Sequence, residues 1–337
     1  MFLSICIPTF NRIHCLKNCL NAIYISKKIF DYEFEVCISD NCSTENVEEI
    51  GNLYKNKINI KFKKNERNIG LGKNILEAVS MAEGEYVWIM GNDDLLLPDT
   101  LKKLYQLIKL NNEVDYFFIN TYQLNSEYIF NCDQPFDTNN LPNNMEKWAK
   151  LNSSKNLNFF EIINPDISWD FLMGMFLSVF RRKKWIENLH VIDQKLISDS
   201  TLFSNVDNTY PHVKIFAYAF SKSRAYYQAE PLLVALRGER EWQNLYNYIE
   251  IVRIPEVLDL YKTRGMPLLQ YLYCKNYSLR NFASYWIKIL FYKGETGLKY
   301  INFKKHIFNN LIFPNVYLSF FYFIFRKILK FKLLSKK

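Results

Sequence analysis

The first 120 residues alternate between short apolar runs and segments with helical periodicity, and this alternation limits the fold more than any other feature of the chain. Residues 2–7 form an apolar run that Pro8 closes, and apolar residues then recur at helical spacing from Ile13 to Ile23. The same order repeats, with strands expected at 34–39, 58–62, 86–90 and 114–119 and helices at 45–54, 73–82 and 98–110. This βα order predicts a Rossmann-like α/β fold, a mostly parallel sheet flanked by helices.

The alternation ends near residue 120, and the rest of the chain has a different pattern. Asn, Asp, Ser and Pro crowd residues 131–166 before an apolar segment at 171–180. From about residue 242 onward the sequence is typical of aromatic-rich helices. We therefore expect one domain over residues 1–240, divided into halves 1–120 and 121–240, and a helical, basic and aromatic C-terminal region over residues 241–337.

Composition excludes overall disorder, because a chain of 337 residues with 49% hydrophobic and 23% charged residues can bury a large core. Lys and Arg outnumber Asp and Glu by 43 to 34. Much of this excess lies near the end, in Lys299, Lys304, Lys305, Arg326, Lys327, Lys330, Lys332, Lys336 and Lys337. A local basic surface of this kind suits anionic lipid or nucleic acid.

Cysteine usage and the apolar segments bear on the compartment. Seven cysteines without any Cys-x-x-Cys pair, several of them in apolar runs, indicate a reducing cytosol. Residues 1–8 lack a basic leader and a long apolar stretch, so no signal peptide is expected. The apolar run from Val316 to Phe325 is shorter than the about 20 residues that a bilayer-spanning helix needs. The sequence therefore predicts a cytoplasmic protein.

Polar residues directly follow three of the expected strands. They form the segments Pro8 to Arg12, Ser39 to Thr44 and Gly91 to Asp94. Because ligands of α/β sheets bind beyond the carboxyl ends of the strands, we expect all three segments to line one crevice. A sugar nucleotide needs hydrogen-bonding groups for its base, oxygens for its ribose and a divalent cation for its diphosphate. The three segments offer such groups.

Five ordered motifs resemble glycosyltransferase family 2 of the GT-A fold. They are Ser-Ile-Cys-Ile-Pro-Thr-Phe-Asn-Arg at 4–12, Ile-Ser-Asp-Asn-Cys-Ser-Thr-Glu at 38–45, Asn-x-Gly at 68–70, Ala-Glu-Gly-Glu-Tyr at 82–86 and the acidic turn at 91–94. The form Gly-Asn-Asp-Asp-Leu-Leu at 91–96 is similar to the abequosyltransferase-like branch of that family. The resemblance implies an inverting, metal-dependent glycosyltransferase that uses a nucleotide-sugar and serves the assembly of a cell-surface polysaccharide, lipopolysaccharide or glycan. It also implies that residues 1–120 bind the donor and residues 121–240 the acceptor.

The resemblance further assigns roles to individual residues. Asp40 would accept a hydrogen bond from a pyrimidine base flanked by residues 8–11, and Asp93 would hold Mn²⁺ or Mg²⁺ at the diphosphate with support from Asp94. The usual turn of the family has a further acid where this chain has Gly91, so one metal or ribose contact is missing or is supplied by water or Asn92. The donor-binding residues implied in this way are Pro8, Thr9, Asn11, Arg12, Asp40, Asn68, Asn74, Asn92, Asp93 and Arg237.

Later segments resemble other parts of the family. Residues 171–182 are similar to the strand that forms the acceptor floor, and Tyr210-Pro211-His212 would supply His212 as a metal ligand or phosphate contact. Arg237 would neutralise the departing diphosphate through its planar, two-pronged hydrogen-bonding group. The alternatives are a core strand, a structural histidine and a surface salt bridge.

An inverting transfer also needs a general base near the acceptor hydroxyl. The resemblance places an Asp or Glu after the acceptor-floor strand, where this chain has Asp199 and Asp207, with Asp170 just before it. No motif selects one of them. Asp207 is preferred as the catalytic residue because it lies close to Tyr210-Pro211-His212.

Other interpretations remain open for the acidic residues and for the function. Asp40 is also placed to cap a helix that begins near Ser43, and Asp93 with Asp94 suits an ordinary turn before a helix. A sugar-1-phosphate nucleotidyltransferase would share the sheet and the metal, although residues 8–12 lack the Gly-rich loop of that class. A non-enzymatic binder of nucleic acid or membrane would explain the basic charge but not the polar strand ends.

The implied partners are a UDP-linked or other pyrimidine-linked sugar and a saccharide acceptor, which includes lipid-linked saccharides, and no nucleic acid. The apolar C-terminal segments lie beside lysines, as they do in interfacial helices, since anionic headgroups attract nearby Lys and Arg. We therefore also expect peripheral attachment to the inner face of the cell membrane. A packed helical appendage or an oligomer contact is the alternative.

Overall fold

The computed structural model describes the chain except for residues 200, 239–242, 293 and 335–337. It divides into an N-terminal unit, Met1–Leu202 with Asp207–Gly238, and a C-terminal unit, Phe203–Val206 with Glu239–Lys337. The domain boundary expected at residue 240, and the basic residues Lys336 and Lys337, lie outside the described residues. The segment Phe203–Val206 belongs to the C-terminal unit although the residues on both sides of it belong to the N-terminal unit.

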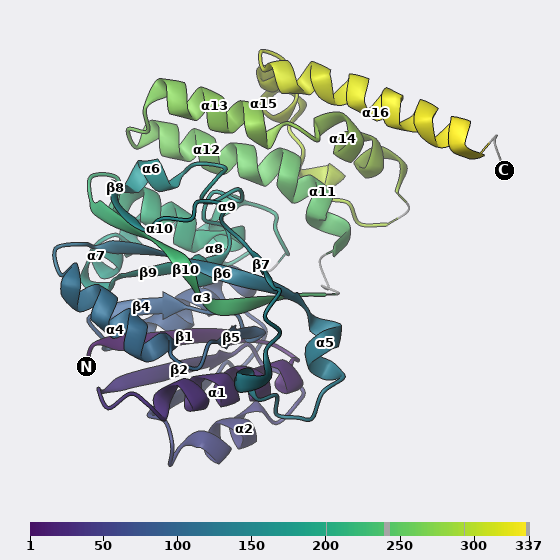
Figure 1. The fold of residues 1–337 in the computed structure, drawn as a ribbon. Coiled ribbons are helices and arrows are strands. Elements are labelled where there is room, and N and C mark those ends of the chain that lie inside the picture. The colour runs from purple at the N-terminus through teal and green to yellow at the C-terminus, as the bar shows by residue number, and fades with distance from the viewer. Residues whose placement is uncertain (200, 239–242, 293, 335–337) are drawn as a thin grey trace. The chain divides into compact units, whose positions relative to one another are not determined.

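The first half of the N-terminal unit has the βα order that the sequence predicts. Four parallel strands pair in the order β3-β2-β1-β4, and a helix follows each of the first three strands (Figure 1). In the register of β1 with β2, Thr9 lies opposite Asp40, so the carboxyl ends of these two strands are level. The bounds are β1 Leu3–Thr9, α1 Ile13–Lys27, β2 Phe34–Asp40, α2 Val47–Tyr54, β3 Ile60–Lys64, α3 Leu71–Ser80 and β4 Tyr86–Ile89.

The second half of this unit makes the sheet mixed. Strand β9 (Ser178–Arg181) lies antiparallel between β4 and β6 (Tyr116–Asn125), and β10 (Arg224–Arg237) is parallel to β6. Strand β9 is antiparallel to its neighbours because the chain leaves β6 at the carboxyl edge of the sheet and enters β9 from the same edge. The remaining strands pair antiparallel with these, namely β5 Asp94–Leu96 and β8 Lys155–Asn158 with β10, and β7 Glu146–Lys147 with β6.

The apolar segment 171–180, expected as one strand, is extended only from Ser178 onward. Phe171 and Leu172 have positive φ angles of 55° and 72°, and a 3₁₀ turn follows at Met175–Leu177. The buried carboxylate of Asp170 holds this turn, because it accepts hydrogen bonds from the Gly174 amide at 2.6 Å and the Ser168 hydroxyl at 2.8 Å. An apolar run shows burial without showing extension, which is why the strand was predicted too long.

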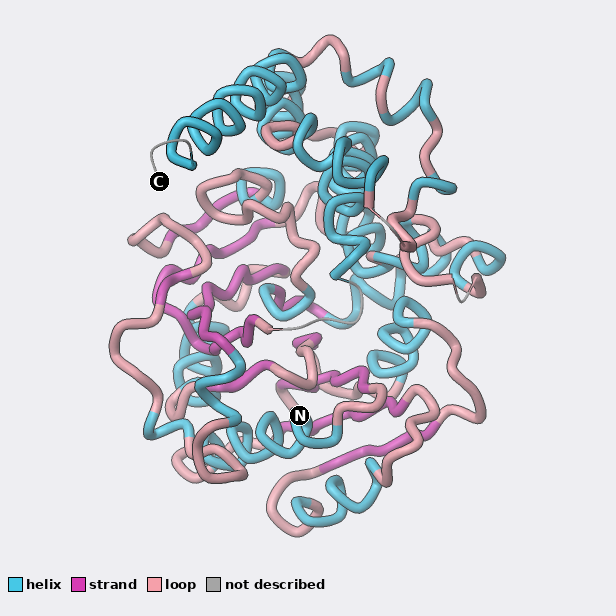
Figure 2. Tube along the Cα trace, turned by 90° about the vertical axis from the view of Figure 1, so that its right-hand side faces the viewer, coloured by secondary structure: helices cyan, strands magenta, loops and turns pink. Residues whose placement is uncertain are grey.

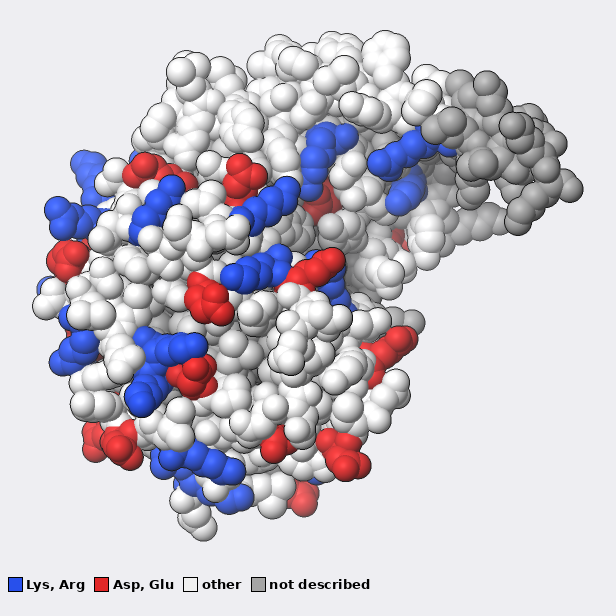
Figure 3. Space-filling view, in the orientation of Figure 1, with Lys and Arg blue, Asp and Glu red and all other residues white. Residues whose placement is uncertain are grey.

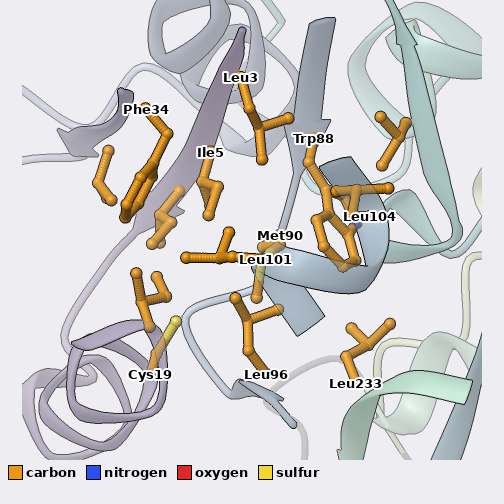
Figure 4. Close-up of a cluster of buried hydrophobic side chains, with 14 of the residues drawn as sticks. Leu3, Ile5, Cys19, Phe34, Trp88, Met90, Leu96, Leu101, Leu104 and Leu233 are labelled. Carbon is orange, nitrogen blue, oxygen red and sulfur yellow. The ribbon is translucent and has the colours of Figure 1, made fainter. Parts of the chain in front are cut away.

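The core of the N-terminal unit lies between the sheet and two helices, α1 and α4 (Thr100–Leu110). Side chains from the strands and these helices point toward one another in one cluster (Figure 4), which includes Leu3, Ile5, Cys19, Trp88, Leu101 and Leu104. Helix α3 packs on β1 and β2 and contacts α10 (Pro211–Ala219). Helices lie on both sides of the strands, which are magenta in Figure 2. Because helices cover the central strands, β1 and β2 are buried along their whole length.

The remaining helices of the N-terminal unit are short. They are α5 Ser126–Phe130, α6 Phe159–Ile162, α7 Arg182–Glu187, α8 Gln194–Ile197 and α9, which spans Val206–Thr209 and begins in the segment assigned to the other unit. Short helices joined by loops fill the region in which the sequence showed no regular alternation.

The C-terminal unit is helical, as its sequence predicts. A π-helical turn at Ile249–Arg253 joins two of its helices, and the others follow in chain order. The face in Figure 3 carries few charged side chains over α13 and the first part of α16. The bounds are α11 Tyr246–Tyr248, α12 Ile254–Thr263, α13 Leu268–Ser278, α14 Phe282–Phe291, α15 Phe303–His306 and α16 Pro314–Leu334.

None of the described helices, taken singly, has both the length and the apolar character of a membrane span. Two neighbouring helical segments, Phe303–Asn310 and Pro314–Arg326, meet both criteria when they are combined, and they are bent by 86° relative to each other.

Candidate active site

The loops that follow β1 and β2 are joined by the side chain of Asn11. Its Oδ1 accepts hydrogen bonds from the Thr44 backbone amide at 2.9 Å and the Thr44 hydroxyl at 3.2 Å. The backbone amide of Asn11 donates to the Ser43 hydroxyl at 2.9 Å. Asn11 has a φ of 47°, which asparagine tolerates better than most residues. The Glu45 carboxylate also accepts the Ile13 amide at 2.9 Å at the start of α1. The first two polar segments therefore form one wall.

Asp40 ends β2 within this wall, and its two carboxylate oxygens have different environments. Oδ1 accepts the Ser43 amide at 3.0 Å and the Ser43 hydroxyl at 2.5 Å, which caps the following turn. Oδ2 is buried and accepts a hydrogen bond from no residue that the structure describes. A buried charged oxygen without a partner is rare in a folded protein. One oxygen thus has the capping role, and the other has no hydrogen-bond partner among the described residues.

Two asparagines from the segment 68–74 fix this wall to the strands. Asn74 is buried in α3, where its amide donates to the carbonyl oxygen of Ser39 at 3.1 Å while its Oδ1 accepts the Ser39 hydroxyl at 2.7 Å. The Oδ1 of Asn68 accepts the side-chain amide of Asn41 at 2.8 Å and the Gly70 amide at 2.9 Å. Asn68 and Asn74, two of the predicted donor-binding residues, therefore already make hydrogen bonds to the protein.

The acidic turn after β4 meets the same wall. The side-chain amide of Asn92 donates to the Thr9 hydroxyl at 2.7 Å, and a guanidinium nitrogen of Arg12 lies 3.1 Å from Oδ2 of Asp93. The Asp93 side chain is 30% exposed. Asp94 is buried and accepts the Gly91 amide at 2.6 Å. The fold thus brings all three polar strand ends together, as expected, with Asp93 as the accessible carboxylate of the turn.

The glycine that departs from the family pattern has a steric explanation. A Cβ atom on Gly91 would lie 2.6 Å from Oδ1 of Asp93 and 3.0 Å from Oδ2 of Asp94. Neither distance allows a side chain without a shift of these carboxylates. The Asp93 carboxylate therefore occupies the space into which an acid at position 91 would project.

The two general-base candidates lie on one loop and have different surroundings. Asp207 is buried, with its Oδ1 2.7 Å and its Oδ2 2.9 Å from the ammonium of Lys214, and Oδ1 also accepts the Asp193 amide. Asp199 is half-buried and accepts the Thr201 amide at 2.9 Å. Burial raises the pKa of Asp170, the third candidate, above its ordinary value.

The other predicted contacts, His212 and Arg237, lie in contrasting environments. His212 is buried with Nε2 3.2 Å from the carbonyl oxygen of Met173, and burial lowers its pKa to about 4, so its ring is neutral at pH 7. Arg237 is 55% exposed at the end of β10, where its Nε donates to the Gln123 side chain at 2.7 Å. In the described part of the chain, no group of three or more His, Cys, Asp or Glu side chains is arranged to hold a metal, so the predicted ligands Asp93, Asp94 and His212 do not form such a group.

Sequence reasoning missed two features at this edge of the sheet. Asn120 directly follows an expected strand, and its buried side chain bonds the backbone of Ala149 and Ala229. The rule that identified the other strand ends would have found it. Trp148 and Trp169 stack with ring centroids 4.7 Å apart, and no sequence signal indicates this pair because the two rings come from separate loops.

Several known proteins are similar to this chain. The model of glycosyl transferase family 2 matches residues 4–180. Abequosyltransferase RfbV of Salmonella typhimurium is 28% identical over 248 residues, 72% of this chain and 68% of that protein. Poly(ribitol-phosphate) beta-N-acetylglucosaminyltransferase TarS of Staphylococcus aureus is 38% identical over 104 residues, which span 30% of this chain and only 18% of TarS.

A solved structure has a similar fold. The crystal structure of S. aureus TarS 1-349 in complex with UDP-GlcNAc has a TM-score of 0.62 at 20% identity, and the match covers 92% of this chain and 80% of that one. Neither the nucleotidyltransferase nor the non-enzymatic alternative is favoured by these similarities. The family match spans more than half of the chain, so the protein belongs to glycosyl transferase family 2, with the GT-A fold, and is a nucleotide-sugar-dependent glycosyltransferase.

Proposed function

We propose that this enzyme transfers a sugar from a pyrimidine nucleotide-sugar, with inversion, to a saccharide acceptor in the assembly of a cell-surface glycan. The observation that carries the donor assignment is the buried Oδ2 of Asp40, because it is an unpartnered acceptor suited to the N–H of a pyrimidine base. The UDP-GlcNAc in the TarS complex supports a UDP-linked donor. Relatives named for poly(ribitol-phosphate) acceptors and as a chondroitin synthase support a polymeric acceptor.

The acidic turn fits a divalent cation that arrives together with the nucleotide. Mg²⁺ and similar ions are commonly held by one or two carboxylates plus substrate phosphates and water, so a ready-made cluster of side chains is not required. The partly exposed Asp93 provides one carboxylate, and Asp94 is held beside it by the Gly91 amide. When bound, the cation supplies positive charge to the departing diphosphate.

Two arginines are placed to act on the same leaving group. Arg12 pairs with Asp93, and binding of a cation at this carboxylate would release the guanidinium to a phosphate oxygen. Arg237 is exposed on β10, which pairs with the strand that begins at Asp94. His212 stays an alternative phosphate contact, although its ring is buried and neutral at pH 7.

The general base belongs to the loop that carries Asp199 and Asp207. Asp207 is buried and both of its carboxylate oxygens already bind the Lys214 ammonium, so an acceptor hydroxyl would have to compete with this ion pair. Asp199 is more accessible. We therefore retain both candidates and give Asp199 the greater weight.

The Asp93→Asn variant tests the metal and donor site. Losing the charge of the exposed carboxylate should lower sugar transfer at least about 100-fold and abolish the gain in UDP affinity that Mn²⁺ provides. A neutral amide oxygen holds a hard divalent cation more weakly than a charged carboxylate does. Calorimetric titration of UDP with and without Mn²⁺ measures the second effect without an acceptor. Asp99→Asn is the matched control, since Asp99 is an exposed carboxylate that pairs with Lys103 away from the turn. Wild-type UDP binding and turnover at limiting Mn²⁺ in Asp93→Asn would reject the assignment.

The C-terminal unit supports peripheral attachment to the cytoplasmic face of a membrane, and thereby access to a lipid-linked acceptor. Large apolar side chains are strongly exposed there, with Phe291 at 80%, Ile312 at 77% and Phe321 at 70%. Exposed basic residues such as Lys304 lie on the neighbouring helix α15. An apolar surface beside basic side chains is typical of helices that lie in the headgroup region of anionic membranes.

The double variant Phe321→Glu/Phe325→Glu tests this attachment. Both side chains are exposed, so the fold should persist, while the two charges should oppose insertion into the lipid interface. Flotation with vesicles of phosphatidylglycerol and phosphatidylcholine should fall to background. Leu110→Glu is the control, because Leu110 is 83% exposed on α4 of the N-terminal unit. Undiminished flotation of the double variant would exclude this surface.

A further inference from the structure

Arg253 is a buried arginine that holds a piece of backbone. It is the last residue of the π-helical turn Ile249–Arg253 and is 3% exposed. Its Nε donates to the carbonyl oxygen of Phe203 at 3.2 Å, and another guanidinium nitrogen donates to the carbonyl oxygen of Ser204. The Tyr248 hydroxyl also donates to the Phe203 carbonyl oxygen, at 3.4 Å. Isolated π-helical turns inside helices are frequent at functional positions.

A chain of charged groups maintains the guanidinium in this place. Burying a charge is unfavourable unless a partner neutralises it, and Glu256 pairs with Arg253 one helical turn further on. The other carboxylate oxygen of Glu256 pairs with Lys305 and lies 3.1 Å from Nε2 of His306. The Asn302 amide donates to Nδ1 of His306 at 3.0 Å, so Nε2 carries the hydrogen and donates to Glu256.

The backbone that Arg253 holds lies inside the loop that carries both general-base candidates. We define the acceptor loop as Asp199 together with residues 201–209, because residue 200 is not among the described residues. The loop leaves the N-terminal unit after Leu202 and re-enters it at Asp207. Phe203 is buried and has a φ of 59°, a left-handed conformation that a bulky residue adopts only under constraint. Two hydrogen bonds from one arginine supply such a constraint.

The rest of the acceptor loop connects to the donor-binding wall. The side-chain amide of Asn208 donates to the carbonyl oxygens of Asp199 at 2.8 Å and Thr201 at 2.9 Å, which closes the loop. The backbone of Asn208 is so close to α3 that a Cβ on Gly72 would lie 2.7 Å from its carbonyl oxygen. Helix α3 also carries Asn74, which bonds the end of β2. The placement of the loop therefore bears directly on the active site.

We propose that Arg253 is a positioning residue of the C-terminal unit that sets the acceptor loop in its catalytic conformation. It acts through the carbonyl groups of Phe203 and Ser204 and so orients Asp199 and Asp207 for proton removal from the acceptor hydroxyl. The C-terminal unit thereby contributes to the transfer step and not only to attachment. This inference rests on the proposed general base in the loop, and nucleotide binding by the N-terminal unit does not depend on it.

The test compares Arg253→Lys with Lys275→Met in the full-length chain. Lysine keeps the positive charge opposite Glu256. It lacks the planar guanidinium group, so it cannot donate to the carbonyl oxygens of Phe203 and Ser204 in the same geometry. Lys275 is equally buried in the same unit, where its ammonium bonds the Pro255 carbonyl oxygen and Asp259, so its loss controls for a general loss of stability. Tyr248→Phe removes the third hydrogen bond to the segment without changing any charge.

Three readouts are required for each variant: UDP affinity with Mn²⁺, release of the nucleoside diphosphate from UDP-, CDP- and dTDP-linked sugars, and hydrogen exchange of peptides within 201–209. For Arg253→Lys we expect kcat to fall roughly tenfold or more, while the donor KM and the UDP affinity stay unchanged, because misplaced catalytic groups slow the reaction without weakening the donor site. Hydrogen exchange in the acceptor loop should become faster. Tyr248→Phe should show a smaller change of the same kind, and Lys275→Met should leave all three readouts near the wild-type values.

The outcomes separate this inference from the proposed function. Unchanged loop exchange or unchanged kcat in Arg253→Lys overturns the inference, and so does an equal loss of kcat in Lys275→Met. A wild-type protein that binds no UDP and releases no nucleoside diphosphate from any of these sugars contradicts the proposed function. Hydrogen exchange then still decides whether Arg253 orders the loop.

Discussion

At the scale of single residues, the two carboxylate oxygens of Asp40 have different surroundings. Oδ1 holds the turn through Ser43, and the buried Oδ2 faces no described donor. An amide at this position would keep an oxygen for the turn and replace the second oxygen by a donor. Substitution therefore separates the local fold from ligand recognition.

We expect Asp40→Asn to weaken UDP binding by roughly 10- to 100-fold. The substitution places an NH₂ group where the carboxylate oxygen would accept the N–H of the base, so two donors would face each other. The saturated rate should change little, because a contact to the base is remote from the bond that breaks. Ser43→Ala removes the hydroxyl's bonds to Oδ1 and to the Asn11 backbone amide but leaves Oδ2 unchanged, so this variant should bind UDP much as wild type does. Titration of UDP and the split between KM and kcat measure both. A loss confined to kcat would argue against a base contact.

The sequence located the polar residues of the site but not the atoms that they contact. Asn11 and Asn74 are where the motifs place them, yet both bond protein groups that no local pattern names. Asn11 contacts Thr44, which is 33 residues away in the sequence, and Asn74 contacts Ser39, which is 35 residues away, so both contacts are long-range properties of the fold. Side-chain partners at this range are set by packing and cannot be obtained from spacing.

At the scale of elements, two helical glycines with different surroundings provide a matched comparison. In α3, a Cβ on Gly72 would lie 2.7 to 2.9 Å from backbone atoms of Asn208, whereas a Cβ on Gly51 in α2 would meet nothing within 4 Å. Both positions gain helix propensity when glycine becomes alanine, up to about 1 kcal/mol. Only Gly72 adds a contact that backbone atoms cannot easily relieve.

We therefore expect opposite signs for the two substitutions. Gly51→Ala should raise the free energy of unfolding by up to about 1 kcal/mol, and Gly72→Ala should lower it by about 1–3 kcal/mol, as overpacking does. Urea unfolding followed by circular dichroism measures both. If Gly72→Ala is as stable as wild type, the close approach of α3 to the acceptor loop is wrong.

Periodicity predicted the elements of the first 120 residues to within a few positions, because each strand and helix there has its own apolar pattern. It did less well beyond them. The expected strand at 171–180 shrinks to β9 because Phe171 and Leu172 take a turn that Asp170 stabilises. The acidic turn leads into strand β5, which exists only because β10 lies beside it. Strands that depend on a distant partner leave a weak local signal.

At the scale of the whole molecule, the buried network around Glu256 couples stability to acidity. Burial alone would raise the pKa of Glu256, but the His306 hydrogen bond and the charges of Arg253 and Lys305 outweigh burial and lower the pKa to about 2 from an ordinary value of 4.5. A depressed carboxyl pKa contributes stability above the unfolded-state value, and this contribution is lost as pH falls through the folded-state value.

Wild type should therefore lose on the order of 3 kcal/mol from this one group between about pH 5 and pH 2, as the depressed pKa predicts. Glu256→Gln removes the titration, so the stability difference between wild type and variant should shrink as pH falls through this range. Urea unfolding at a series of pH values measures that difference. A difference that stays constant from pH 6 to pH 2 would contradict the role of the ionised carboxylate.

The assignment of Phe203–Val206 to the C-terminal unit is a property that sequence reasoning could not supply. Arg253 recognises the carbonyl oxygens of this segment, and every residue type offers the same carbonyl group. Only a folded chain shows which of them the guanidinium reaches.

The position of β9 also constrains the order in which the chain can fold. Strands β1 to β4 are complete by Ile89, but β6 can join them only through β9, which begins at Ser178. The outer edge of β4 therefore stays unpaired until the segment between β4 and β9 has been synthesised and β9 has paired with β4. Bringing together two strands that are so far apart in the sequence is slow. Nascent or truncated chains that stop before Ser178 should expose this edge, together with that of β6, and open strand edges are templates for aggregation. Chaperone demand and expression yield will thus depend on how quickly this short antiparallel strand arrives.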